Sequence, residues 1–311
     1  MKVIKYTDIR NSSVSMDTMI GWVYDALRNK NQSILPPKTS LKPEDNVFFN
    51  FMPCIIPEMQ VAGVKVVSRH PNDNPALKSN IMLFDLNNGT PLAVLDGDFI
   101  TTARTGIVAA ITVKELARKD FGKISVVGLG NTARATVDAL AAIFKDRELN
   151  ISLLEYKDQA ELFMDRFKDV SNLHFTVEKD IDEMFASSDV IISCVSYADS
   201  QFTNVDNYKP GCLVVPVHTR GFQNCDDVFD LVVCDDIAHI SGFGKFNEMK
   251  VVRELSTVIS EGLGRTSDSE RILAYNIGIA LHDIYFAKCF YEQGLGIENI
   301  DFESPVDKFW W

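Results

Sequence analysis

The residues from Lys123 to Glu155 combine a short apolar run, a glycine-containing turn and a helical pattern, in an order that suits nucleotide binding. Gly128, Gly130 and Ala133 form the pattern G-x-G-x-x-A directly after a run of β-branched and small residues. In this pattern the first glycine permits a tight turn, the second lets a pyrophosphate approach the backbone, and the small third residue lets the helix pack on the strand. We therefore expect a dinucleotide site here; the alternative is a glycine turn of purely structural importance.

The helix that follows this turn begins near Asn131 and Thr132. Free N–H groups and the positive end of the helix dipole favour a phosphate at such a position. The next apolar run, residues 151–154, ends on the carboxylate of Glu155. A carboxylate there would accept hydrogen bonds from ribose hydroxyls and repel a 2′-phosphate, so the sequence predicts NAD in preference to NADP. The alternatives are that Glu155 is a solvated acid at a strand end, and that nearby Lys157 weakens the preference.

The composition is ordinary for a soluble globular protein and does not suggest a nucleic-acid-binding or membrane protein. The chain has 311 residues, which is long enough for two domains that each have a hydrophobic core. Of these residues 46% are hydrophobic and 24% are charged. A net charge of -12 disfavours nucleic acid and anionic membrane surfaces as partners. No apolar run reaches the roughly 18 residues of a membrane span, and the N-terminus lacks a signal-like apolar region. We expect a cytoplasmic protein.

The cysteines do not suggest a metal site. Six cysteines and five histidines are scattered along the chain, and no C-x-x-C pair occurs among them. We therefore expect buried free thiols and no bound metal. No serine or cysteine lies in a G-x-S-x-G motif, so a hydrolase is not favoured.

The first region, residues 1–120, is expected to form an antiparallel sheet with a leading helix. Turn-forming residues separate its apolar runs, and NNGTP at 87–91 is typical of a β-hairpin. The pattern predicts helices over 15–30 and 101–118, and strands over 47–52, 61–68, 81–85 and 92–95.

From residue 121 to 266 apolar runs alternate with helical patterns, which predicts an α/β fold with a Rossmann-type doubly wound parallel sheet. Two further helices are expected over 251–261 and 267–290. The second is long and apolar, so we expect the segment from about 267 to 311 to join the domain formed by residues 1–120. The remaining predicted elements are strands over 151–154, 174–177, 189–194, 211–217 and 231–234 and helices over 159–167 and 180–185.

Several blocks of the sequence resemble the ornithine cyclodeaminase and mu-crystallin family, which includes alanine dehydrogenases and ketimine reductases. The matching blocks occur in a fixed order over most of the chain: PPK (36–38), AGVKVVSRHPND (62–73), LFDLNNGTPLAVLDGDFITTARTG (83–106), GLGNTA (128–133), ELSTVISEGLGR (254–265) and YNIGIALHD (275–283). The resemblance implies a nucleotide fold joined to a second α+β domain, and a homodimer in which the sheets of the first region meet.

The resemblance also assigns roles to individual residues. Lys65 in the GVK block matches the family's active-site lysine, and Arg104 in ARTG matches an arginine that holds the substrate carboxylate or lies by the cofactor. Thr101 stands where the family also has a threonine on the cofactor side, and Lys38 replaces an arginine that contacts the carboxylate in many members. An arginine binds a carboxylate bidentately, and a lysine in a partly dry pocket can exchange a proton with a nitrogen. The alternatives are a snorkelling Lys65 and a solvated Lys38.

The chain departs from the family after residues 213–217. Cyclodeaminases have an aspartate in a G-G-D segment at this point, whereas this chain has His218, Thr219 and Arg220. A cation there would repel the terminal ammonium group of ornithine, which argues against ornithine cyclisation. His218 or Arg220 would instead contact a second anionic group of the substrate; the alternative is a loop cation that faces water.

Other residues match family positions with less definite roles. Cys194, Val195 and Ser196 follow the fourth strand of the nucleotide domain, near the expected nicotinamide, and are interpreted as contact surface. Asp189 and Asp283 are assigned no catalytic role.

These observations predict an NAD-dependent oxidoreductase that transfers hydride at the α-carbon of a small amino or imino acid. Arg104 and Lys38 would hold the carboxylate, and Lys65 would supply or orient a proton. The alternatives are a true ornithine cyclodeaminase, a synthase that joins two amino acids through an imine, and a non-catalytic binding protein that keeps the nucleotide fold.

Overall fold

The computed structural model describes residues 1–196, 198–296, 298–301 and 308; the other residues of the expected C-terminal segment lie outside this range. The chain divides into two compact units. The first comprises Met1–Ser13, Asn31–Thr101 and the described residues from Ala280 onward. The second comprises Val14–Lys30 and Thr102–Ile279. This division assigns the leading helix and residues 102–120 to the nucleotide fold, whereas the sequence suggested a boundary near residue 120.

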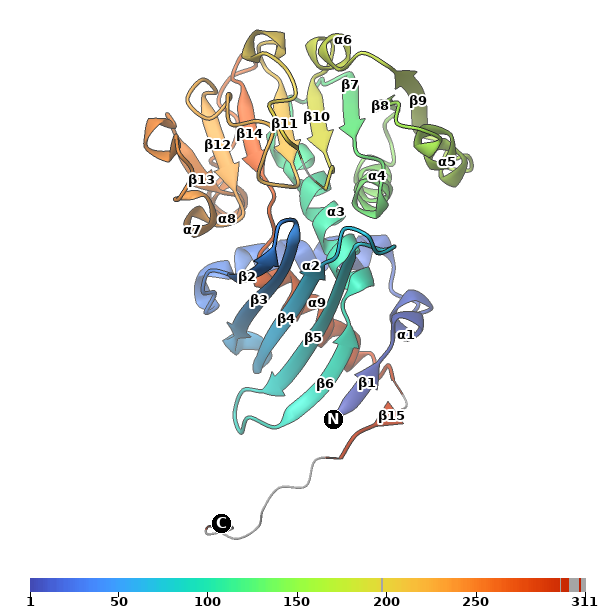
Figure 1. The fold of residues 1–311 in the computed structure, drawn as a ribbon, viewed down its shortest axis with the longest axis vertical. Helices are drawn as coiled ribbons and strands as arrows, with labels where there is room; N and C mark the ends of the chain where they lie inside the picture. The colour runs from blue at the N-terminus through green and yellow to red at the C-terminus, as the bar shows by residue number, and fades with distance from the viewer. Residues whose placement is uncertain (197, 297, 302–307, 309–311) are drawn as a thin grey trace. The chain divides into compact units, whose positions relative to one another are not determined.

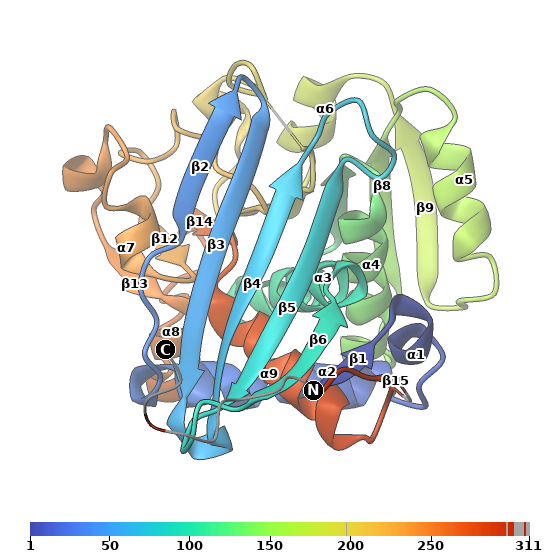
Figure 2. The same cartoon turned by 60° about the horizontal axis from the view of Figure 1, so that its bottom comes forward.

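The first unit contains a mostly antiparallel sheet in the order β15-β1-β6-β5-β4-β3-β2. All neighbouring strands are antiparallel except β1 and β6, which are parallel. Figure 2 shows β2 to β6 side by side. The predicted hairpin is confirmed, because β5 and β6 pair antiparallel across the NNGTP turn, where Gly89 has a φ of 75°. The strands are β1 Lys2–Ile4, β2 Thr39–Glu44, β3 Val47–Ile56, β4 Val61–Arg69, β5 Leu77–Asp85, β6 Pro91–Asp96 and β15 Glu298–Asn299.

One helix, α9 (Ala280–Glu292), covers a face of this sheet by packing on β3, β4 and β5 (Figure 2). Alternate residues of β4 are buried, which is the period of a strand with one face against a core. Gly63 belongs to this buried face, and a Cβ atom there would lie 2.7 Å from Cδ1 of Ile284 on α9. The absence of a side chain therefore lets the helix approach the strand. A short helix, α1 (Tyr6–Arg10), completes the unit.

The second unit is built on a parallel sheet in the order β13-β12-β14-β11-β10-β7-β8-β9, which Figure 1 shows from left to right. A parallel sheet covered on both faces consists of nearly continuous apolar strands, and β10, β11, β12 and β14 are buried throughout. The predicted Rossmann-type fold is confirmed. The strands are β7 Lys123–Val127, β8 Leu149–Leu154, β9 Leu173–Glu178, β10 Val190–Ser193, β11 Leu213–Pro216, β12 Leu231–Cys234, β13 Val252–Glu254 and β14 Ile272–Tyr275.

Helices flank this parallel sheet (Figure 1). They are α2 Met16–Arg28, α3 Asp98–Leu116, α4 Asn131–Ile143, α5 Gln159–Arg166, α6 Ile181–Ala186, α7 Ile237–Ile240 and α8 Leu255–Glu261. The first residues of α3 belong to the first unit, so the division of the chain falls inside this helix. Among the described residues, no helix is both long and apolar enough to cross a membrane.

The predicted helix over 267–290 is wrong. Its first part forms β14, which lies between β11 and β12, and only the residues from Ala280 onward form a helix, α9. A short apolar run such as ILAY fits a buried strand as well as a helix, so periodicity could not separate the two. Gly278, with a φ of 83°, interrupts the pattern between the strand and the helix. The predicted helix over 251–261 likewise begins as strand β13.

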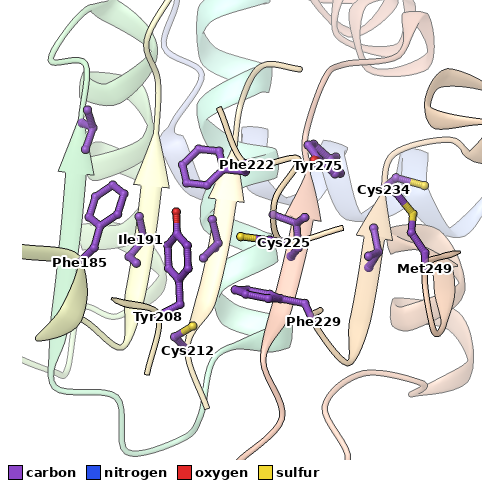
Figure 3. Close-up of a cluster of buried hydrophobic side chains, with 14 of the residues drawn as sticks. Phe185, Ile191, Tyr208, Cys212, Phe222, Cys225, Phe229, Cys234, Met249 and Tyr275 are labelled. Atoms are coloured by element: carbon purple, nitrogen blue, oxygen red, sulfur yellow. The ribbon is translucent and has the colours of Figure 1, made fainter. Parts of the chain in front are cut away.

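Aromatic residues and thiols form a large part of the core of the second unit. Figure 3 shows Phe185, Tyr208, Phe222 and Phe229 along the sheet, and the ring centroids of Tyr208 and Phe229 are 5.6 Å apart. Cys212, Cys225 and Cys234 belong to the same cluster. Cys54 is also buried, Cys194 and Cys289 are half-buried, and all six cysteines are free, as the sequence predicted. Burial raises the pKa of Cys212 to about 12.

Gly106 on α3 and Gly21 on α2 provide a matched test of packing in the second unit. A Cβ atom on Gly106 would lie 2.5 Å from the backbone nitrogen of Thr136 on α4, whereas one on Gly21 would have nothing within 4 Å. Gly106→Ala should lower the free energy of unfolding by roughly 1–3 kcal/mol through overpacking. Gly21→Ala should raise it by up to about 1 kcal/mol, because alanine favours helix. Urea unfolding curves measure both changes, and equal stabilities would contradict the close approach of α3 and α4.

Candidate active site

The turn after β7 has the geometry that a dinucleotide requires. Gly128 has a φ of 80°, and a Cβ atom there would lie 2.6 Å from the backbone nitrogen of Val195. A Cβ atom on Gly130 would have nothing within 4 Å, so this side of the turn is open. Ala133 is fully buried where α4 packs on the sheet. The residues therefore fit a bound pyrophosphate, because the turn is tight where it meets protein and bare where a ligand would approach.

The first turn of α4 points the right groups at such a ligand. Gly130 is the N-cap, and a glycine offers no side-chain acceptor to the first N–H groups. Asn131, which is exposed, and Thr132, which is half-buried, are the first residues of the helix. Their backbone N–H groups have no intrahelical acceptor, so an anion at this position would satisfy them.

Glu155 follows β8 directly. Its backbone N–H donates to the carbonyl of Glu178 at 2.8 Å, and its carboxylate lies 3.5 Å from Nζ of Lys179. The side chain of Glu155 is 43% exposed and that of Lys179 is 82% exposed, so this pair is weak. The carboxylate thus stands at the carboxyl end of the strand beside β7 and remains accessible to a ribose.

The segment after β10 lies against the glycine turn. The backbone N–H of Cys194 donates to the carbonyl of Val127 at 2.8 Å, and Val195 is the residue that Gly128 faces. Ser196, the next residue, is exposed. Burial raises the pKa of the Cys194 thiol to about 12, so it is a neutral group near pH 7. These residues can form contact surface, and the thiol is poorly suited to act as a nucleophile.

His218 follows β11 and is a neutral hydrogen-bonding group. Its Nε2 lies 2.7 Å from Oγ of Ser193, the last residue of β10. Burial lowers the pKa of His218 to about 4, because the imidazolium form would lose its hydration. A hydrogen bond with the backbone of Arg220 opposes this lowering but is outweighed by burial. At neutral pH the ring therefore offers hydrogen bonds but no positive charge.

Arg220 is exposed and lines a cavity of about 520 Å³. The turn that carries it is held by Gln223, whose Oε1 accepts from the N–H of Gly221 at 2.9 Å and whose amide donates to the carbonyl of Thr219. The other lining residues are mostly small or polar and follow β10, β11 and α7: Ala198, Asp199, Ser200, Gln201, Thr219, Gly221, Gln223, Gly242, Phe243 and Gly244.

Arg104 lies in the second turn of α3, because the helix begins at Asp98 rather than at the predicted Thr101. Its side chain is 4% exposed. The guanidinium group lies against the backbone of Gly278, where a Cβ atom would be 2.5 Å from Nη1. A buried guanidinium group is unusual, and its contact with the α-carbon of a glycine indicates a fixed position.

In the first unit, Lys65 on β4 and Asp283 on α9 form a buried ion pair. Lys65 Nζ lies 2.6 Å from Oδ2 of Asp283, and the side chains are 1% and 0% exposed. The sequence predicted Lys65 as a site residue but gave Asp283 no role. The distance between them along the chain concealed their contact, and only the family block 275–283 pointed to Asp283. Burial and the charge of Asp283 raise the pKa of Cys54 to about 12, so this thiol is neutral.

The other predicted residues of the first unit are Thr101 and Lys38. The hydroxyl of Thr101 lies 3.1 Å from that of Ser79, which also donates to the carboxylate of Asp98. Lys38 is half-buried and directly precedes β2. The remaining predicted site residues belong to the second unit. Among the described residues, no three histidines, cysteines or carboxylates gather in a way that could hold a metal ion.

Several curated relatives of the chain are named as reductases or dehydrogenases. The Delta(1)-pyrroline-2-carboxylate reductase of Bacillus cereus is 28% identical, with 96% of this chain and 99% of the relative covered. The N-((2S)-2-amino-2-carboxyethyl)-L-glutamate dehydrogenase of Staphylococcus aureus is 25% identical over 76% of this chain and 75% of the relative.

A solved structure shares the fold over nearly the whole chain. It is the Delta(1)-pyrroline-2-carboxylate reductase of Thermococcus litoralis in complex with NADH and L-proline, which matches with a TM-score of 0.84 and 23% identity and covers 96% of this chain and 100% of its own. The model of the ornithine cyclodeaminase/mu-crystallin family matches residues 2–297. Because this match spans almost the whole sequence, the chain belongs to the ornithine cyclodeaminase/mu-crystallin family.

Proposed function

We propose that this protein is an NAD-dependent oxidoreductase that transfers hydride to or from the α-carbon of a small amino or imino acid. The proposal is carried by the open glycine turn at the start of α4, in a chain with several curated relatives named as dehydrogenases or reductases. When bound, the cofactor supplies or removes the hydride. The protein must then bind the carboxylate, orient the nitrogen and control one proton.

Arg104 is the proposed ligand of the α-carboxylate. A guanidinium matches a carboxylate with two parallel N–H donors, and a buried one does so without competition from water. Lys38 is a second proposed contact, which would add charge but no fixed fork. Thr101 and the segment Cys194, Val195 and Ser196 are proposed contacts of the cofactor.

Lys65 is the proposed proton donor in the reductive direction. The carboxylate of Asp283 at 2.6 Å stabilises the ammonium form of Lys65 and directs one of its N–H groups. Transfer of a proton from Nζ to the imine nitrogen would make the α-carbon more electrophilic, which favours hydride addition. In the oxidative direction the neutral amine would take the proton back. Asp283 is thus a proposed positioning residue for Lys65.

Two of the alternatives are less well supported. A true ornithine cyclodeaminase would have to place the substrate's terminal ammonium near Arg220, where like charges repel. A pure binding protein would have no use for a buried lysine paired with a carboxylate, because such pairs are costly to desolvate.

A second candidate function is reduction of an imine that carries another anionic group. It is favoured by Arg220, which lines the cavity beyond β10 and β11. Ligands of α/β sheets bind at the carboxyl ends of the strands, so the cavity lies on the side where substrate is expected. The relative from Staphylococcus aureus is named for a substrate that contains glutamate. His218 would add hydrogen bonds but no charge to this subsite.

We further propose a homodimer in a cytoplasmic setting. The family resemblance implies the dimer, and an archaeal alanine dehydrogenase of the same fold is described as a dimer with bound NAD. The free thiols fit a reducing compartment.

The proposed activity is tested by following NADH absorbance with purified protein. Pyrroline-2-carboxylate, or pyruvate with ammonia, should oxidise NADH, and ornithine with NAD should be assayed separately for proline because cyclisation causes no net change in NADH. Bound NADH without turnover on any amino or imino acid would favour a binding protein.

Lys65→Met should lower kcat by roughly 10²–10⁴-fold, because the proton donor is lost. It should also destabilise the protein by about 3–5 kcal/mol, because the buried carboxylate of Asp283 loses the ammonium group that compensates its charge. Lys65→Met/Asp283→Asn should recover most of that stability and remain inactive. Stopped assays and thermal melts separate the two effects, with the exposed Lys78→Met as control. Wild-type turnover in Lys65→Met would remove the proposed role.

Glu155→Ser should relax discrimination against NADPH, because the carboxylate no longer repels a 2′-phosphate. We expect the ratio of kcat/KM for NADH over NADPH to fall by about tenfold, which corresponds to ~1.4 kcal/mol. Glu161→Ser, which removes an exposed carboxylate of the neighbouring helix α5, should leave the ratio unchanged. Equal ratios in both variants would show that Glu155 does not select the cofactor.

Arg220→Gln should impair only substrates with a second carboxylate. The imine formed from oxaloacetate and ammonia should show a KM raised by roughly tenfold or more, because a charge-assisted hydrogen bond is lost. The imine from pyruvate and ammonia should be used as before. The control is Arg166→Gln on α5, which removes a half-exposed cation. Equal effects on both imines would argue against an anionic subsite at Arg220.

A further inference from the structure

The head of Arg104 lies where several strands of the parallel sheet end. Asp235 directly follows β12, and Asn276 and Gly278 follow β14. The last residues of these strands, Cys234 and Tyr275, are paired in register, so the two following segments emerge side by side. The backbone N–H of Asn276 also donates to the carbonyl of Pro216 at the end of β11, at 2.9 Å.

Asp235 holds the turn after β14 in place. Its Oδ2 accepts from the backbone N–H of Gly278 at 2.6 Å, and its Oδ1 accepts from Nδ2 of Asn276 at 3.4 Å. The side chain of Asp235 is 1% exposed. A buried carboxylate is costly unless hydrogen bonds and a nearby cation compensate it, and here a backbone amide and a guanidinium do so.

The same turn supports Arg104. Gly278 has a φ of 83°, a conformation that side chains with a Cβ atom rarely adopt. A Cβ atom on this residue would lie 2.5 Å from Nη1, 3.0 Å from Nη2 and 3.2 Å from Cζ of Arg104. The guanidinium group therefore rests on the bare α-carbon of a turn whose N–H is fixed by Asp235.

The charges of Arg104 and Asp235 also act on each other. Burial raises the pKa of Asp235, while the hydrogen bond from Gly278 and the charge of Arg104 oppose that rise. The charge of the Lys30 ammonium group acts in the same direction. Arg104 thus favours the carboxylate form of Asp235, and the carboxyl group of Asp235 holds the turn beside Arg104 through the N–H of Gly278.

We propose that Asp235 and Gly278 are positioning residues that set the direction of the Arg104 fork toward the substrate's α-carboxylate. The inference rests on the proposed role of Arg104 as carboxylate ligand. A guanidinium held against the α-carbon of a glycine whose N–H is fixed by Asp235 has a defined orientation before the substrate arrives. Substrate binding then loses little side-chain entropy, so a change at Asp235 or Gly278 should raise KM.

The neighbouring carboxylate, Asp236, offers a matched control. Its contacts within the described part of the chain do not involve the turn at Gly278. Its carboxylate lies 2.8 Å from Nζ of Lys30 and caps α7 by accepting from the N–H of Ala238 at 2.9 Å. Removal of the Asp236 carboxylate should affect stability and leave the position of the Arg104 guanidinium unchanged.

The test compares Asp235→Asn, Gly278→Ala and Asp236→Asn in the full-length protein. We would measure kcat and KM for reduction of pyrroline-2-carboxylate, the dissociation constant of NADH from its fluorescence, and the melting temperature. Asp235→Asn keeps the size of the side chain, and Gly278→Ala pushes on the flexible end of Arg104, so one variant remains informative if the other fails to fold. Both should raise KM by about tenfold or more, with kcat within about threefold and NADH affinity unchanged.

Arg104→Lys separates the possible failures. If it raises KM while Asp235→Asn and Gly278→Ala behave like Asp236→Asn, Asp235 and Gly278 do not position Arg104 and the inference is wrong. If Arg104→Lys leaves KM unchanged, the proposed role of Arg104 fails, and the inference with it. A matched loss of NADH affinity in Asp235→Asn and Gly278→Ala would indicate a general structural role and would also overturn the inference.

Discussion

The constraint on which the second unit depends is the geometry of a parallel sheet. Every strand must return through a crossover on a face of the sheet, so all carboxyl ends gather on a single edge. The residues that follow the strands here are the ones assigned to the candidate site or to its support. They are Gly128 after β7, Glu155 after β8, Cys194 after β10, Arg220 beyond β11, Asp235 after β12 and Gly278 beyond β14. Residues far apart in the sequence therefore meet without any local motif that joins them.

The first unit depends on a different constraint, because it buries a charged lysine, Lys65, in an apolar layer. The strand β4 alternates between buried and partly exposed residues, and Lys65 occupies a buried position between Gly63 and Val67. Helix α9 can approach closely because Gly63 lacks a side chain, and it brings Asp283 within 2.6 Å of the lysine. The pair compensates the cost of desolvation and leaves the lysine with a defined orientation.

Much of the fold was predictable because apolar periodicity and glycine turns are local signals. The dinucleotide turn, the hairpin at 87–91 and the alternation of strands and helices were all recognised this way. Strand β14 was missed because its four buried residues fit a helix equally well, and β2 because all of its residues are exposed and show no alternation. Asp235 and the pairing of Asp283 with Lys65 were missed for another reason, since tertiary contacts across long separations leave no spacing to detect.

The thiols described in the core have a practical consequence for labelling. Burial raises the pKa of five cysteines far above neutrality, to about 12 for Cys54, Cys194 and Cys212 and higher for Cys225 and Cys234. The thiolate is the species that reacts with maleimides and disulfide reagents, and its fraction at these positions is negligible at neutral pH. A cysteine introduced on an exposed face, for example in place of Glu161 on α5, would react far faster than these five. A fluorophore or spin label could then be attached there while the native core keeps its sulfur atoms.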